Sequence, residues 1–125
     1  MMREILFKGK RVDNGEWTEG YFFKSWDKVF LLWGMTGNSP NMEEVKPETV
    51  GQYTGLKDKN EKKIFEGDIL LKGFEKVLVK WNANQCRWGI YSNNYEICGF
   101  NESTQGYFEV IGNIYDNHEL LEVEK

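Results

Sequence analysis

Short stretches of alternating apolar and polar residues, separated by turn residues, run along most of this chain and predict β-strands. Residues 12–17, Val-Asp-Asn-Gly-Glu-Trp, place Asn-Gly between strand-like residues, the strongest short signal for a β-hairpin. The pattern pairs residues 4–12 with residues 17–24. Residues 28–33 form a continuous apolar strand, and residues 34–41, rich in Gly, Asn, Ser and Pro, are expected to form a mobile loop.

Further strands are expected at residues 45–53, 76–81, 87–91 and 95–98, with polar turns between the later ones. The most densely patterned part is residues 52–70. Its polar segment 57–61 predicts a tight turn, because Asp and Asn side chains hydrogen-bond to the nearby backbone. Strand-like residues 64–65 and 69–71 then flank a second turn.

The second turn is Glu66-Gly67-Asp68. A structural role is expected, in which Asp68 accepts backbone N–H bonds and Gly67 supplies a positive φ. Two carboxylates so close in sequence also suit acid–base chemistry or magnesium binding when a fold brings them together.

The C-terminal part predicts a strand followed by a short helix. Residues 108–115 alternate as a strand does, and Asn117 stands where a helix N-cap is expected, with Glu119 in the favoured first turn.

These segments resemble the YopX family of bacteriophage and prophage proteins. The resemblance covers residues 3–7, 50–71, 77–81 and 108–121. Two positions depart from the family pattern: Glu61 stands where Gly is usual in the first turn, and His118 stands where Pro is usual after the capping Asn. The resemblance implies an undefined molecular role and supplies no catalytic residues.

A mainly β fold is therefore expected: an N-terminal β-hairpin layer joined to a small SH3-like β-barrel, with one short C-terminal helix. The 125 residues suffice for a single YopX-like domain, residues 1–125, with one core. If the chain divides, the loop near 34–44 would separate a β layer, residues 1–44, from the barrel and helix, residues 45–125.

Charge is distributed unevenly. Lys/Arg minus Asp/Glu gives 7 − 8 = −1 for residues 1–53, 8 − 5 = +3 for residues 54–87 and 1 − 7 = −6 for residues 88–125. The basic middle segment is a candidate binding face if its lysines and tryptophans share one surface: Lys57, Lys59, Lys62, Lys63, Lys72, Lys76, Lys80, Trp81 and Trp88. A solvated rim of lysines protecting edge strands, with the tryptophans in the core, is the competing interpretation.

Candidate catalytic and metal-binding groups are few. His118 is the single histidine and is expected on the surface, and Cys86 and Cys98 are expected to be reduced and to serve packing. Asp58-Lys59-Asn60 begins like a calcium loop, but Lys63 stands where that loop requires Gly. No catalytic residue, cofactor or metal is predicted.

These observations favour a non-enzymatic phage or prophage accessory protein that acts through protein binding or self-assembly as a homo-oligomer. The apolar start at residues 5–7 is too short for a signal peptide or membrane helix, so the bacterial cytoplasm is expected and no membrane. A nucleic-acid-binding β-barrel module is the alternative, which the net charge of −4 does not favour. A small metal-dependent hydrolase or nuclease is the more distant alternative.

Overall fold

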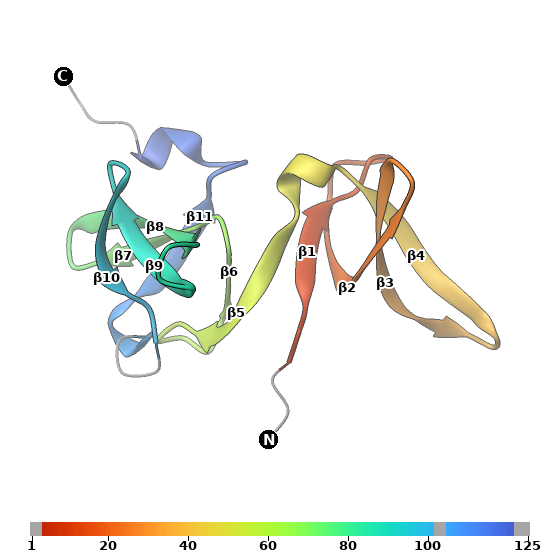
Figure 1. Ribbon diagram of the computed structural model, residues 1–125, viewed down its shortest axis with the longest axis horizontal. Coiled ribbons are helices and arrows are strands. Elements are labelled where there is room, and N and C mark those ends of the chain that lie inside the picture. The colour runs from red at the N-terminus through yellow and green to blue at the C-terminus, as the bar shows by residue number, and fades with distance from the viewer. Residues whose placement is uncertain (1–3, 102–104, 122–125) are drawn as a thin grey trace. The chain divides into compact units, whose positions relative to one another are not determined.

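A computed structural model describes residues 4–101 and 105–121, and over these residues the chain is mainly β, as predicted (Figure 1). It separates into two compact units, with the boundary between Tyr53 and Thr54. Residues 34–44, where the sequence suggested a division, lie inside the first unit. The boundary falls within strand β5 (Gly51–Lys57), so the two units are joined by a strand and not by a loop.

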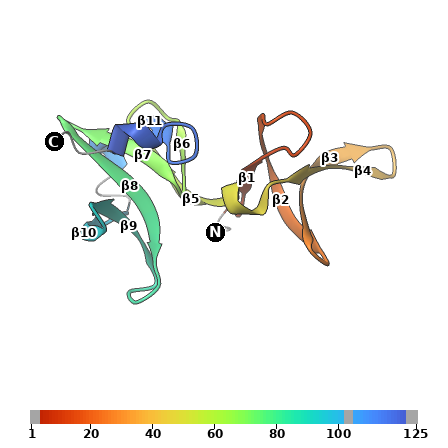
Figure 2. The ribbon, with the colours of Figure 1, turned by 90° about the horizontal axis from the view of Figure 1, so that it is seen from above.

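The first unit is an antiparallel meander. Its strands are β1 (Phe7–Lys10), β2 (Trp17–Ser25), β3 (Lys28–Thr36) and β4 (Ser39–Val45), followed by the 3-10 helix η1 (Pro47–Thr49). Neighbouring strands pair in the order β4-β3-β2-β1, and β1 also pairs with the start of β5 (Figures 1 and 2). The predicted Asn14-Gly15 hairpin between β1 and β2 is confirmed, with Gly15 at φ +72°.

The prediction of a loop at residues 34–41 is wrong. Strand β3 continues to Thr36 and β4 begins at Ser39, so that only a tight turn remains. Gly37, at φ +63°, supplies the positive φ of this turn. Pro40 is tolerated inside a strand because β4 lies at the edge of its sheet, where a missing N–H does not interrupt a ladder.

The core of the first unit is small. Val29, Leu31 and Val45 are buried, and Phe7 and Val50 pack against them. One face of the β2–β3–β4 sheet covers this core, and the other face points away from it.

The second unit contains a five-stranded antiparallel sheet in the order β10-β9-β8-β7-β11. The strands are β7 (Asp68–Lys72), β8 (Glu75–Asn82), β9 (Arg87–Ser92), β10 (Tyr95–Gly99) and β11 (Glu109–Asn113). The end of β5, the short β6 (Lys63–Phe65) and the 3-10 helix η2 (Gln105–Tyr107) complete the unit before its C-terminal turn. This strand order has two free ends, β10 and β11, so the predicted closed SH3-like barrel is not confirmed.

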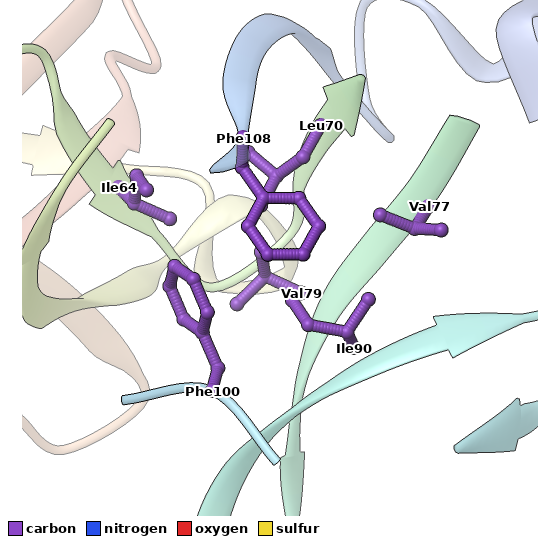
Figure 3. Packing of buried hydrophobic residues seen from close by; sticks show 7 residues of the cluster. All are labelled: Ile64, Leu70, Val77, Val79, Ile90, Phe100 and Phe108. Carbon is purple, nitrogen blue, oxygen red and sulfur yellow. The ribbon is translucent and has the colours of Figure 1, made fainter. Parts of the chain in front are cut away.

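Seven buried side chains form the core of the second unit: Ile64, Leu70, Val77, Val79, Ile90, Phe100 and Phe108. Figure 3 shows them pointing toward one another; five come from strands β6 to β9, and Phe100 and Phe108 come from the segments just after β10 and just before β11. The rings of Phe100 and Phe108 meet edge to face with centroids 5.6 Å apart, a favourable aromatic geometry. Each such side chain contributes about 1.5–3 kcal/mol through burial, so this core is the principal stabilising feature of the unit.

The described part of the predicted C-terminal helix is one 3-10 turn, η3 (His118–Leu121), and no α-helix is confirmed there. The Asn117 carbonyl accepts from the Leu120 N–H at 2.9 Å, and the Asn117 side-chain oxygen accepts from the Asn113 N–H at 3.2 Å. The side chain of the predicted cap therefore bonds back to β11.

Candidate functional site

The sequence-predicted lysines and tryptophans do not share one face. Successive side chains of a strand point to opposite faces, so Lys76, Leu78 and Lys80 of β8 lie on the face away from the core. We call this surface the lysine face. Val77 and Val79 point into the core, and Trp81 follows them on that side.

Trp81 and Trp88 are direct cross-strand partners of β8 and β9. Their rings meet edge to face with centroids 5.0 Å apart. Trp88 packs against the core, whereas Trp81 is 46% exposed at the end of the sheet. Of the two tryptophans, Trp88 therefore contributes to the core, as the competing interpretation expected, and Trp81 remains half-exposed.

The other lysines are spread over the second unit. Lys57 ends β5, Lys62 lies in the following turn and Lys63 begins β6. Lys59 makes an ion pair of 3.5 Å with Glu109. The Lys72 ammonium lies 5.9 Å from the Tyr107 ring centroid, a cation–π distance, at the end of β7.

Asp58 is the polar anchor of the turn between β5 and β6. One carboxylate oxygen accepts from the N–H groups of Asn60 at 2.8 Å and Lys62 at 2.9 Å. The other accepts from the N–H of Val110 in β11 at 2.9 Å. The turn predicted from the polar sequence is confirmed, and Asp58 also ties it to β11, 52 residues away along the chain.

Burial tends to raise the pKa of Asp58, but the hydrogen bonds from Val110, Lys62 and Asn60 outweigh it and lower the pKa below its ordinary value. Because its pKa is lowered, Asp58 is ionised at neutral pH although it is only 4% exposed, and it acts as a structural carboxylate. Glu61, which stands where Gly is usual in the family, has φ +65° in this turn, so the positive φ is present without glycine.

Glu66-Gly67-Asp68 forms the predicted structural turn. Gly67 has φ +89°, and Asp68 accepts from the Phe65 N–H at 2.8 Å while only 1% exposed. A Cβ at Gly67 would meet the Tyr115 ring at 3.2 Å. The positive φ and the backbone hydrogen bond are thus confirmed.

A pocket of about 250 Å³ lies on the lysine face. Its lining includes Lys76, Leu78 and Lys80 of β8, Tyr91 of β9 and the turn that follows β9. Ile114, Leu121 and His118 from the C-terminal part also line it, although His118 was expected only as a surface residue.

The Lys80 ammonium lies 4.9 Å from the Tyr91 ring centroid. Of the nine predicted site residues, the structure brings Lys76 and Lys80 together in this pocket.

A salt bridge borders the same face. Arg87 donates to Glu96 at 2.6 Å, and the Asn82 amide donates to the other Glu96 oxygen at 2.8 Å. The hydrogen bond from Arg87, then that from Asn82, lowers the pKa of Glu96 below its ordinary value.

The first unit carries an apolar surface that sequence reasoning missed. Register places five apolar side chains on the face of β2–β3–β4 that points away from the core, together with Glu44, the cross-strand partner of Phe30. We call these five the aromatic face: Tyr21, Phe23, Phe30, Leu32 and Met42. Tyr21, Phe23 and Met42 are 58%, 49% and 41% exposed. The rings of Phe23 and Phe30, direct cross-strand partners, lie 6.3 Å apart.

A signal for this surface was present in the sequence. Residues 29–33 are all apolar, and such strands are usually buried on both faces. In this unit only one face covers the core.

Both cysteines are free thiols in the structure. Cys98 packs against the second core, as predicted, but Cys86 is exposed in the β8–β9 turn at φ +52°, so the packing role predicted for Cys86 is wrong. Among the described residues no group of three or more His, Cys, Asp or Glu is placed to hold a metal ion. In the same part of the chain, no helix has the length and apolar character needed to cross a bilayer.

Comparison with known proteins identifies relatives by sequence and by fold. The family described as YopX protein matches residues 10–122. The crystal structure of protein EF1440 from Enterococcus faecalis is similar, with a TM-score of 0.59 and 25% identity, over 97% of this chain and 100% of that one. A search of curated proteins finds no match. Because the family match spans nearly the whole chain, both units included, this protein belongs to the YopX family.

Proposed function

We propose that this YopX-family chain is a non-enzymatic phage or prophage accessory protein of the bacterial cytoplasm that acts by binding protein through its aromatic face. The form of binding we propose is self-assembly, with a second copy of the chain covering that face. The observation that carries the proposal is the half-exposed set Tyr21, Phe23 and Met42 beside Phe30 and Leu32.

Contiguous apolar patches of this kind are uncommon on soluble monomers and mark interaction sites. Aromatic residues and Met are also enriched at protein interfaces, where they act as anchors. Isolated apolar side chains need no such explanation, but these five are cross-strand neighbours on one face. The patch therefore has the composition and continuity of an interface centre.

Self-assembly suits a patch that lies on the face of a β-sheet. A two-fold axis would place the aromatic face of one copy on that of the next, and two β-sheets pack in this way with their side chains interdigitated, about 10 Å apart. Aromatic side chains bury about 150–250 Å² each, so a few of them form the centre of an interface of about 800 Å² per partner.

Nucleic-acid binding is the second candidate. The feature that favours it is the half-exposed ring of Trp81, which lies close to Arg87 at the start of β9. Exposed aromatic rings can stack on nucleic-acid bases. The likeness of the second unit to SH3-like barrels, and a hydrolase or nuclease role for Glu66 and Asp68, stay predictions.

The test combines light scattering with site-specific crosslinking. A double variant, Phe23→Thr with Met42→Thr, keeps strand-forming residues but removes the apolar anchors. We expect the natural chain to be a dimer or larger and the double variant to be a monomer. The matched control is Phe74→Ser, because Phe74 is fully exposed in a turn of the second unit. That variant should keep the natural mass.

A photo-crosslinking amino acid at position 23, used in phage-infected or induced host cells, identifies what covers the face. A crosslink to a second copy supports self-assembly, and a reproducible crosslink to one other protein replaces the second copy with that partner. A monomeric natural chain without any crosslink overturns the proposal. A complex that nuclease treatment dissolves favours the nucleic-acid alternative.

A further inference from the structure

We infer that the pocket on the lysine face binds a small organic anion of about mononucleotide size. Its anionic group would lie at the ammonium groups of Lys76 and Lys80, and its flat apolar part on Leu78, Ile114 and Leu121. This inference is independent of the aromatic face, which belongs to the first unit.

Size and composition favour a small molecule. The volume of about 250 Å³ lies just below that of pockets for drug-sized ligands, about 300–1,000 Å³. Leu78, Ile114 and Leu121 give the lining an apolar part, and all three are half-buried. An apolar surface with a few polar groups at its rim is the usual make-up of a ligand site.

Charge selects an anion. The described lining includes Lys76 and Lys80 but no carboxylate, although the whole chain carries a net charge of −4. No described carboxylate lies within ion-pair distance of either lysine. A cationic hollow in an acidic protein concentrates anions locally.

The pocket rim is built before any ligand arrives. Asn93 and Asn94 connect β9 and β10 and both have positive φ, 52° and 73°. Two such residues form the tight hairpin turn that matches strand twist. The Lys80 ammonium rests 4.9 Å from the Tyr91 ring centroid, which restrains its long side chain. Restrained groups lose less entropy on binding.

The test is an NMR titration of the full chain with adenosine monophosphate, which carries both an anionic group and a flat body. Adenosine and inorganic phosphate, each lacking one of these parts, are separate arms. We expect the monophosphate to shift backbone amide signals of residues 76–80, 91–94 and 114–121 and to bind at least about tenfold more tightly than either. Equal binding by adenosine, equal binding by phosphate, or no shift at these residues overturns the inference.

A charge variant sharpens the result. Lys76→Gln with Lys80→Gln should weaken binding of the monophosphate by about tenfold or more. Lys24→Gln with Lys28→Gln is the matched control, because it removes the same charge from exposed strand positions of the first unit. Equal weakening in both variants would attribute binding to overall charge and would overturn the assignment of this pocket.

Discussion

The two units of this chain use their hydrophobic residues differently. The second unit buries seven apolar side chains in one core and fixes a polar turn to β11 through Asp58. The first unit has only three buried side chains in its core cluster and leaves an aromatic face half-exposed. Hydrophobic residues are thus used for stability in one unit and are available for binding in the other, so substitutions in the two should have different consequences.

The largest difference is expected from phenylalanine truncation. Phe108→Ala removes a buried ring from the second core and should cost about 3–5 kcal/mol of unfolding free energy. Phe23→Ala, on the aromatic face, should cost about 1 kcal/mol or less in the monomer. Urea unfolding followed by NMR signals of each unit checks both values. Similar losses in the two variants would contradict the contrast between the units.

Asp58→Ala should cost about 3 kcal/mol, because it leaves the Asn60, Lys62 and Val110 N–H groups without their acceptor. Denaturant unfolding of the second unit measures the loss. Asp13→Ala, at an exposed ion pair of the first unit, is the control and should change little. An equal effect at the two positions would refute the anchoring role of Asp58.

Acidification should affect the second unit through the same group. The pKa of Asp58 is lower in the folded chain than its ordinary value of 3.8 in the unfolded chain. At a pH between these two pKa values, the unfolded chain therefore binds more protons than the folded chain. The stabilisation is complete above the unfolded pKa and declines as the pH falls through the folded pKa. Unfolding free energy measured from neutral pH downward should show this decline, and the slope should decrease in Asp58→Asn. An unchanged slope would count against the linkage.

Gly67→Ala should cost about 1 kcal/mol or more, because alanine disfavours φ +89° and its Cβ would meet the Tyr115 ring at 3.2 Å. Glu66→Ala, one residue earlier, should cost much less. Thermal melts of the two variants measure the difference. Equal melting midpoints for the two variants would contradict the requirement for a positive φ at Gly67.

The smallest effect is expected at Glu61, where a non-glycine residue holds φ +65°. In Glu61→Gly, glycine adopts this left-handed conformation without the cost of about 1–2 kcal/mol that glutamate bears. Part of that gain is offset because glycine loses more backbone entropy on folding. A net stabilisation of about 0.5 kcal/mol should appear in the same melts. A destabilised variant would show that the Glu61 side chain contributes more than its backbone strain removes.

Local signals explain what the sequence predicted well. Asn14-Gly15, Glu66-Gly67-Asp68 and the Asp58 turn depend on backbone preferences and hydrogen bonds within a few residues, and all three are present. The loop prediction at residues 34–41 failed because turn-forming residues also occur in an edge strand, where the hairpin partner decides the conformation.

Strand alternation could have predicted the separation of the lysines from the tryptophans. Lys76 and Lys80 are an even number of residues apart, and Trp81 is one residue further, so one strand must place it on the opposite face. Pairing with distant strands decides which face of β8 is covered by the core. The approach of Ile114 and Leu121 to β8 depends on the same long-range pairing. Those contacts are not encoded by local pattern.

Strand β5 has a consequence for synthesis on the ribosome. Its first residues pair with β1, which is made early, so the meander of the first unit has all of its partners once Gln52 has left the exit tunnel. The second unit needs β11, near the C-terminus. Domains fold from the N-terminus during translation, so we expect the aromatic face to form on the nascent chain. Neighbouring ribosomes on one messenger RNA would then bring such faces together before either chain is released.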